Sequence, residues 1–326
     1  MTENKLEKLQ IELHEAHDEC LKVLNDDIGD KSTTLYHYTS LEAALEILKN
    51  GTLRFTDARY CNDPNEIIEG LKILAEVHME LRMSQKKEEF HFFLFMDAMI
   101  CTLISTFWDT KDIPETFLKA TYENLAKTAL PSGLRIHPSS AYICCFSESN
   151  DDLRQWIPYA RNGEGLGIGF EGVNQEHSIT LNNTFIVRVS YATIEKKKEY
   201  AYAIYKKACE IFLRTELSLI ASLMVELQIL TMYDIIACKS ENYKDEREWR
   251  LIKICTNNIL LEETSFINSG SIIKPYIDIP LNKDSLIDII LGPKSSNSLN
   301  HISLKKILTK YNYKKTTISN SNVLYR

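Results

Sequence analysis

Apolar side chains recur at helical spacing in three long parts of the chain. Two of these parts run from about 64 to 130 and from about 195 to 240, and both are predicted to be helical blocks. The third is residues 1–25, where leucines recur among Glu, Lys and His: Leu6, Leu9, Leu13, Leu21 and Leu24. This pattern predicts an amphipathic helix that packs on the main body or on a second copy of the chain.

A strand, a helix and a second strand are predicted within residues 35–56. The first strand is short and aromatic and covers Leu35 to Tyr38. Thr39 followed three residues later by Glu42 is typical of a capping box at the start of a helix, and Gly51 is expected to end that helix. The second strand then follows directly.

Further strands are predicted at 141–146, 185–191, 248–254, 276–281 and 286–291. Glycines also alternate in residues 163–170, which favours a strand that another backbone or a ligand approaches closely. Because the strands form clusters separated by helical blocks, we expect an α+β fold with two helical insertions and not a doubly wound parallel sheet. Residues 1–30 are expected to form an N-terminal helix, and residues 31–326 a single α+β domain.

The composition narrows the expected partners. The chain has 326 residues, 44% of them hydrophobic, and a formal net charge of -7. An acidic chain has no general electrostatic attraction for nucleic acid or an anionic membrane, so a polyanion would need a local basic patch. The eight cysteines form no CxxC pair and the opening MTENKLEKLQ resembles no signal segment. These features favour a cytoplasmic protein with reduced thiols.

Two apolar stretches are interpreted as core helices of a protein that does not enter a membrane. Residues 90–108 approach bilayer length, yet Asp97 lies near their centre. Residues 217–225 are too short to span a bilayer.

Several common catalytic and metal motifs are missing from the sequence. It contains no GxSxG, HExxH or GxxxxGK[ST] string, which removes the main support for those hydrolase and P-loop classes. His14, His17 and Cys20 recur at a spacing of three, but they lie on one helix without a fourth ligand nearby in the sequence. We therefore expect no metal site.

The densest polar cluster is Glu246-Arg247-Glu248-Trp249-Arg250, where a turn enters a strand. If the strand begins by Glu246, its period of two places Glu246, Glu248 and Arg250 on one face. Paired carboxylates suit binding of a sugar hydroxyl, stabilisation of an oxocarbenium-like centre, or general acid and base catalysis. The alternative is a solvated strand edge on which Glu and Arg form ordinary ion pairs.

A second candidate cluster is Tyr36-His37-Tyr38-Thr39-Ser40, at the end of a strand and before a helix. There, His37 is suited to contact a ribose hydroxyl, while the helix N-terminus offers backbone N–H groups to a polar ligand. A half-buried structural histidine is the alternative. Asn62, Asp63 and Glu66 are either turn and cap residues or part of a loop over the site.

Four separated strings occur in an order that resembles an uncharacterised bacterial family, domain of unknown function 2971. They are LYHYTSLEAALEILKNGTLRFTDARYCNDPNE, CFSESNDDLRQWIPYARNGEGLGIGFE, YKDEREWRLI and IDIILGP. The resemblance covers about residues 34–295. Some relatives in this family are linked with abortive phage resistance, so the resemblance implies an effector in anti-phage defence.

The order of a strand-borne His37, a strand ending in Phe146-Ser147 and a Glu246-x-Glu248 pair is also similar to NAD-dependent ADP-ribosyltransferases. This similarity implies the split mixed sheet of that superfamily and NAD as substrate. It implies that His37 anchors NAD, Ser147 supports the site, Glu248 is the catalytic carboxylate and Glu246 orients an acceptor. The implied NAD-binding set is His37, Tyr38, Thr39, Phe146, Ser147, Trp156 and Tyr159.

Other functions remain open at this stage. Glu246 and Glu248 would equally suit a glycosidase or a nuclease-type hydrolase that works without NAD. A non-catalytic sensor or partner-binding module is the third reading, with the N-terminal helix and the helical insertions as its interface. The acceptor of an ADP-ribosyl group, protein or nucleic acid, is not identified by the sequence.

Overall fold

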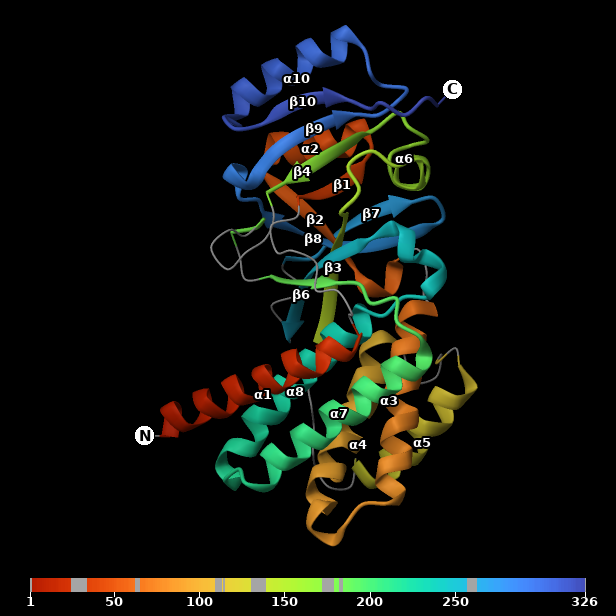
Figure 1. The fold of residues 1–326 in the computed structure, drawn as a ribbon, viewed down its shortest axis with the longest axis vertical. Helices are drawn as coiled ribbons and strands as arrows, with labels where there is room; N and C mark the ends of the chain where they lie inside the picture. Colours follow the sequence, from red (N-terminus) through yellow and green to blue (C-terminus); the bar gives the residue numbers. More distant parts are fainter. Residues whose placement is uncertain are drawn as a thin grey trace.

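A layer of long helices and a layer of β-strands lie one above the other along the longest axis of the molecule (Figure 1). The structure is a computed structural model that describes residues 2–24, 34–61, 65–108, 113, 115–129, 139–171, 179–181, 184–256 and 263–325. The helical layer holds α1 (Thr2–Leu24), α3 (Asn65–Met83), α4 (Phe90–Phe107), α5 (Thr116–Ala129), α7 (Ile194–Leu213) and α8 (Leu217–Ile236). The predicted α+β class, with an N-terminal helix and two helical insertions, is confirmed.

The sheet has ten strands in the described residues, and helices α2 (Leu41–Asn50), α6 (Leu153–Tyr159) and α10 (Ser298–Tyr311) accompany it. The strands are β1 (Leu35–Thr39), β2 (Thr52–Asp57), β3 (Ser139–Ser147), β4 (Leu166–Phe170), β5 (Phe185–Arg188), β6 (Glu248–Thr256), β7 (Ser265–Ser269), β8 (Ile272–Pro280), β9 (Leu286–Leu291) and β10 (Thr317–Asn320). The main path runs β10-β9-β4-β1-β3-β2-β8-β7, and β6 pairs with β3 and β5. Strands β9 and β10 are parallel, whereas the other pairs are antiparallel.

Strand β3 has three neighbours, although a strand has only two edges. Strand β6 pairs along all of β3, from Ser139 to Ser147, and so takes one edge completely. The other edge is shared, because β2 pairs at Tyr142 and Ile143 while β1 pairs at Ser147. The sheet therefore forks between β1 and β2, and the predicted mixed sheet is confirmed.

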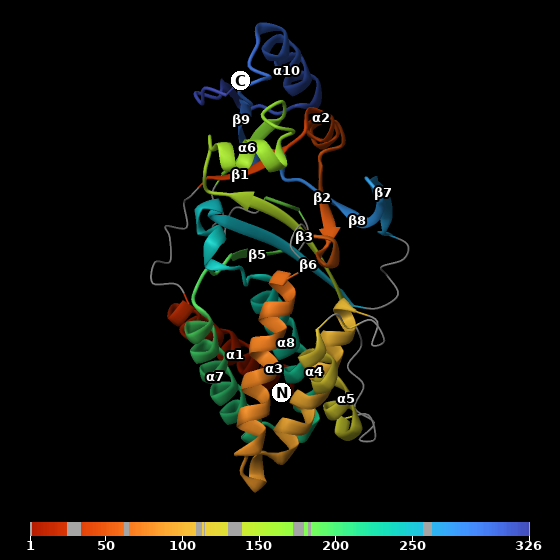
Figure 2. The ribbon, with the colours of Figure 1, turned by 90° about the vertical axis from the view of Figure 1, so that its right-hand side faces the viewer.

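Strands β3 and β6 are covered on both faces, as the apolar run at 141–146 predicts. On one face, Ile143 and Ile252 pack into the core of the helical layer. On the other face, Cys144 and Leu251 pack into a second core to which α2 and α10 contribute. Figure 2 shows the two strands crossing the molecule above the helical layer.

Two local predictions need correction. The cap of α2 is Ser40, whose hydroxyl accepts a hydrogen bond from the Ala43 N–H at 3.1 Å, so Thr39 and Glu42 do not form the predicted capping box. Thr39 is instead the last residue of β1, because its backbone pairs with Leu166 of β4. The β7–β8 hairpin extends the sheet beyond the single strand predicted at 276–281.

The alternating glycines of 163–170 serve close packing, as the sequence predicts. A β-carbon added at Gly165 would lie 2.1 Å from the carbonyl oxygen of Thr39. One added at Gly169 would lie 2.8 Å from the ring of Tyr36. Only glycine lets the chain at these two positions lie this close to β1. Gly165 and Gly169 therefore determine how closely β1 and β4 pack.

Two helical segments in the described residues, Lys87–Phe107 and Leu217–Ile236, are long and apolar enough to cross a membrane. Most of the apolar stretch in each segment is buried inside the protein. Core helices of soluble proteins have the same length, composition and burial. The second apolar helix continues to Ile236, well beyond the run at 217–225 seen in the sequence. Within α4, Asp97 is fully buried and pairs with His78 and Arg82.

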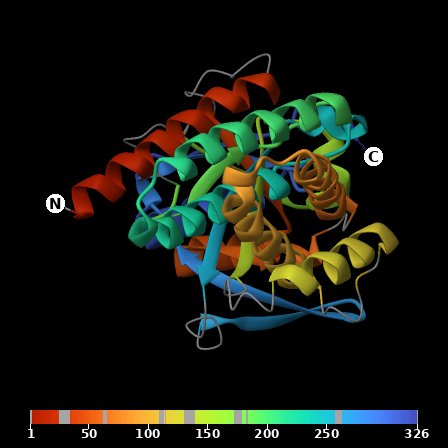
Figure 3. The ribbon, with the colours of Figure 1, turned by 90° about the horizontal axis from the view of Figure 1, so that it is seen from below.

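Helix α1 packs within the chain, beside α7 and α8 (Figure 3). Leu13 of its apolar face is buried in the helical core. Its two histidines pair with acids of α8, since His14 Nε2 lies 2.7 Å from Glu226 and His17 Nε2 lies 2.9 Å from Asp234. The described residues hold no group of His, Cys, Asp or Glu arranged for a metal.

We expect Leu13→Ala to lower the free energy of unfolding by roughly 2–5 kcal/mol, because Leu13 is only 1% exposed and its removal leaves a cavity. Ile11→Ala on the same helix is the matched control, since Ile11 is 51% exposed and should change stability by about 0.5 kcal/mol or less. Urea denaturation followed by circular dichroism measures both. Equal effects would contradict this docking of α1.

Candidate functional site

His37 lies at the point where the sheet forks, and its side chain contacts the backbone of β3 there. In the stretch of β3 between its pairing with β2 and its pairing with β1, the imidazole Nδ1 lies 2.8 Å from the carbonyl oxygen of Cys145. A carbonyl only accepts hydrogen bonds, so Nδ1 carries the proton and Nε2 is the accepting nitrogen. Burial lowers the pKa of His37, and the Cys145 carbonyl opposes this only in part. The side chain is therefore a neutral imidazole at physiological pH.

Glu246 and Glu248 lie close together, as predicted, but the backbone that brings them together is not the predicted strand. Strand β6 begins at Glu248, not by Glu246, because Glu246 ends the 3-10 helix η4 (Glu241–Glu246). Between them, Arg247 adopts the left-handed conformation, with φ 45° and ψ 50°. The Ser147 hydroxyl donates to the Glu246 carbonyl at 2.7 Å and holds this turn against the end of β3.

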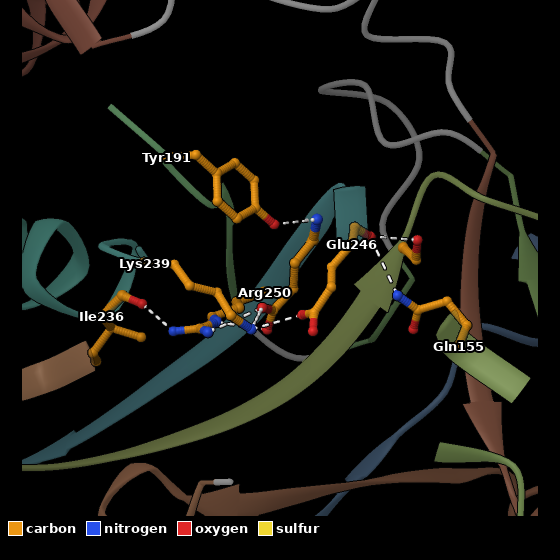
Figure 4. A network of polar contacts seen from close by, with 8 residues as sticks. Gln155, Tyr191, Ile236, Lys239, Glu246 and Arg250 are labelled. Atoms are coloured by element: carbon orange, nitrogen blue, oxygen red, sulfur yellow. Dashed lines mark hydrogen bonds and ion pairs between the residues drawn. The ribbon is translucent and has the colours of Figure 1, made fainter. Parts of the chain in front are cut away.

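The two carboxylates share one cation. Lys239 Nζ donates to Glu246 at 2.7 Å and to Glu248 at 2.8 Å (Figure 4). Arg250 adds a bidentate contact to Glu248, with Nε at 2.7 Å and Nη2 at 3.0 Å. The Glu248 N–H donates to the Tyr191 hydroxyl at 2.9 Å, so the backbone of this residue is fixed as well.

Burial of the ion pairs decides the protonation of Glu248. Glu248, Arg250 and Lys239 are 6%, 3% and 6% exposed. Burial alone would raise the pKa of Glu248, but Arg250 and then Lys239 outweigh it and lower that pKa to about 2. Glu248 is therefore an anion at physiological pH and holds no proton to donate.

One pocket brings most of the predicted site residues together. It encloses about 830 Å³ of space that protein atoms do not fill, its open mouth included. Six of the predicted residues line it: His37, Tyr38, Phe146, Tyr159, Glu246 and Glu248. Seven other residues complete the lining: Tyr36, Cys61, Cys145, Gln155, Lys239, Tyr243 and Arg250.

The remaining predicted residues lie behind the pocket wall. Ser147 is buried and supports the turn at Glu246. Trp156 is fully buried, packs edge-on against Tyr38 with ring centroids 4.7 Å apart, and donates its indole N–H to Asp151. Neither Trp156 nor Thr39 faces the pocket, so Trp156 backs the aromatic wall and presents no surface for stacking. Asn62, Asp63 and the side chain of Glu66 lie outside the described residues.

Cys145 lies beside His37, but the two do not form a nucleophilic pair. The imidazole bonds to the Cys145 carbonyl and not to its thiol. Burial raises the pKa of the Cys145 thiol well above its usual value, and the neighbouring Glu248 carboxylate raises it further. The thiol therefore stays protonated and is a poor nucleophile.

Sequence reasoning missed Lys239, the residue that joins the two carboxylates. It follows α8 in a segment without periodicity, and long-range contacts set its position: the bridge between Ser190 and Cys238, and the hydrogen bond from the Lys239 N–H to the Ser190 carbonyl. Gln155, on α6, donates its amide to the Glu246 carbonyl at 3.4 Å and was missed because this contact joins distant parts of the chain. The sequence placed Arg250 on the same strand face as Glu248, but it did not predict the ion pair between them.

A family model described as protein of unknown function (DUF2971) matches part of the chain. The match covers residues 155–251. It includes both carboxylates, Lys239 and Arg250, and it supports the resemblance to this family seen in the sequence. No curated protein and no solved structure matches the chain.

We expect Glu248→Gln to lower the free energy of unfolding at pH 7 by roughly 3–5 kcal/mol, the range for breaking a buried ion pair. The folded pKa of about 2 lies below the ordinary value of 4.5, so the carboxylate stabilises the fold above pH 4.5. This contribution is lost as the pH falls from 4.5 towards 2. The difference between parent and variant should therefore narrow over that window in urea denaturation.

The matched control is Glu164→Gln, because Glu164 is exposed and should change stability little at either pH. A constant difference between Glu248→Gln and the parent from pH 7 to pH 3 would contradict the buried ion network.

Proposed function

We propose that this pocket binds NAD and cleaves its nicotinamide–ribose bond, as an ADP-ribosyltransferase or an NAD-consuming effector. One observation carries the proposal. A neutral imidazole on β1 and an ionised carboxylate on β6 line one pocket, although His37 and Glu248 are far apart in the sequence. The similarity of the His, Ser and Glu-x-Glu order to ADP-ribosyltransferases supports the same reading.

The pocket has surfaces for both a flat ring and a sugar. Tyr36, Tyr38, Phe146 and Tyr159 give it an aromatic lining, and Tyr243 is 40% exposed in the same lining. Aromatic side chains suit stacking against nicotinamide or adenine. The same lining carries the charged side chains of Lys239, Glu246, Glu248 and Arg250, which would offer hydrogen-bond partners to a ribose.

Glu248 retains the capacity to bind a hydroxyl although it is ion-paired. An ionised carboxylate offers about four acceptor sites. Arg250 uses two of these, Lys239 uses one and the Cys145 thiol hydrogen-bonds to the same carboxylate, so a ribose 2′-hydroxyl would take the place of this weak thiol contact. The two cations also fix the orientation of the carboxylate, and such preorganisation favours the transition state.

The proposed reaction is a substitution at the anomeric carbon of the ribose. The C–N bond breaks and its electron pair leaves with nicotinamide, which departs as a neutral molecule. Positive charge then develops on the ribose, and Glu248 stabilises it more than it stabilises bound NAD. A hydroxyl of the acceptor, or water, forms the new bond to the anomeric carbon, and its proton passes to Nε2 of His37.

The protonation state of Glu248 disfavours a hydrolase that uses this residue as its acid. A glycosidase of the usual kind needs one carboxylic acid that donates a proton to the leaving group. With its pKa lowered to about 2, Glu248 cannot serve as that acid. Nicotinamide needs no proton to leave, because its ring nitrogen is already positively charged in NAD. An ionised Glu248 therefore suits NAD better than a neutral glycoside that would need a proton from this residue.

We place this activity in the cytoplasm, where NAD and reduced thiols are both available. The resemblance to relatives linked with phage resistance fits an effector that modifies a cellular target or depletes NAD after infection. The macromolecular acceptor is then a protein or a nucleic acid of the infected cell.

We expect the purified protein to release nicotinamide from NAD, alone or with a cell lysate as source of acceptor. Glu248→Gln should lower the rate on the order of 100-fold or more, because it removes one preorganised electrostatic contact. Chromatographic assay of nicotinamide measures both, at a temperature where circular dichroism shows the variant folded. Glu164→Gln, an exposed site, should keep the parent rate.

A second variant separates chemistry from folding. His37→Gln retains an amide that can donate towards Cys145 but lacks the basic nitrogen, so we expect a loss of roughly 100-fold with the fold intact. No nicotinamide release by the parent, or parent-like rates in both folded variants, would remove the proposal and leave the ion network with a structural role.

A further inference from the structure

A second pocket lies on the other side of the segment that carries Glu246 and Glu248. It encloses about 1100 Å³ of unfilled space, its wide mouth included. The intervening residue, Arg247, lines this second pocket, whereas its two neighbours line the first. We call it the basic pocket, after its cations Arg188, Lys196, Lys244 and Arg247.

The charge of the basic pocket is opposite to that of the chain. Its lining holds these four cations and one acid, Glu241, in a protein with a net charge of -7. Arg188 lies 3.5 Å from Glu148 and is partly neutralised. Arg247 and Lys244 are both exposed, so their charges are the ones most available to a ligand. A local excess of positive charge on an acidic protein favours an anionic ligand.

Thr193 and Arg247 belong to the backbone around the pocket. Thr193 caps α7 by accepting a hydrogen bond from the Lys196 N–H, and Glu195 lies in the first turn, so the positive charge of the pocket comes from its side chains. Arg247 is held in the left-handed conformation, which turns it away from its glutamate neighbours. Tyr191 also lines the pocket, and its hydroxyl accepts a hydrogen bond from the Glu248 N–H.

We propose that the basic pocket binds successive phosphate groups of a nucleotide, held as a free nucleoside triphosphate or as an unpaired nucleic-acid strand. Arginine and lysine together with backbone N–H groups are the usual partners of phosphate. Tyr191 in the lining is an aromatic side chain, the kind on which a base stacks. The pocket is large enough for more than one phosphate.

This site is separate from the proposed NAD chemistry and does not depend on it. A ligand in the basic pocket lies beside the turn at Arg247, one residue from each carboxylate.

The test is fluorescence polarisation with two labelled probes, ATP and an eight-residue oligothymidylate, in the absence of NAD. We expect at least one of them to bind, and to bind roughly tenfold or more weakly to the double variant Arg247→Asn, Lys244→Gln. Asparagine is chosen because it tolerates the left-handed conformation. For the oligonucleotide, the slope of log affinity against log salt should fall by about 0.7 for each phosphate that the variant no longer neutralises.

The matched control is Lys305→Gln, Lys306→Gln, which removes the same charge from exposed positions of α10, at the far end of the sheet (Figure 1). It should bind like the parent. Weaker binding of ATP alone identifies a free nucleotide as ligand, and weaker binding of the oligonucleotide identifies a strand. Binding of neither probe, equal weakening in both double variants, or equal competition by polyglutamate of the same charge would overturn the proposal.

Discussion

The buried carboxylate of Glu248 is the group on which the rest of the site depends, because a charge in the protein interior has to be paired. Arg250 comes from the same strand, but Lys239 comes from the chain that follows α8. The pairing therefore ties the start of β6 to the end of a helix in the other layer. It also draws Glu246 inward, since both carboxylates reach the same ammonium group.

The fork in the sheet determines the position of His37, the other main group of the site, because a buried polar group there also needs a partner. Where neither β1 nor β2 pairs with β3, a backbone carbonyl needs another donor, and the imidazole of His37 provides it. That hydrogen bond fixes which nitrogen carries the proton. A neutral base and a permanent anion then line the same pocket. Each is set by its surroundings, and together they favour chemistry in which positive charge appears on the substrate.

Most of the elements could be predicted from local patterns, because helical spacing and alternation act over a few residues, although strand β7 was missed. The candidate site was also visible in part, since strong local signals marked His37 and the two glutamates. Lys239 and the fork had no such signal, because contacts between distant segments create them. Trp156 was predicted to stack on a ligand because it is aromatic and near the site in the sequence. Burial cannot be read from that signal, and the indole is in fact buried against Tyr38.

The carboxylate of Glu248 is expected to contact the ribose of a bound dinucleotide. A crystal structure with an NAD analogue, in which a methylene group replaces the oxygen of the nicotinamide ribose ring, tests this directly because the analogue cannot form an oxocarbenium ion. We expect a ribose hydroxyl within roughly 2.6–3.2 Å of Glu248, with Arg250 and Lys239 still in place. A dinucleotide bound elsewhere, or a pocket without it at saturating concentration, would contradict the proposed role of Glu248.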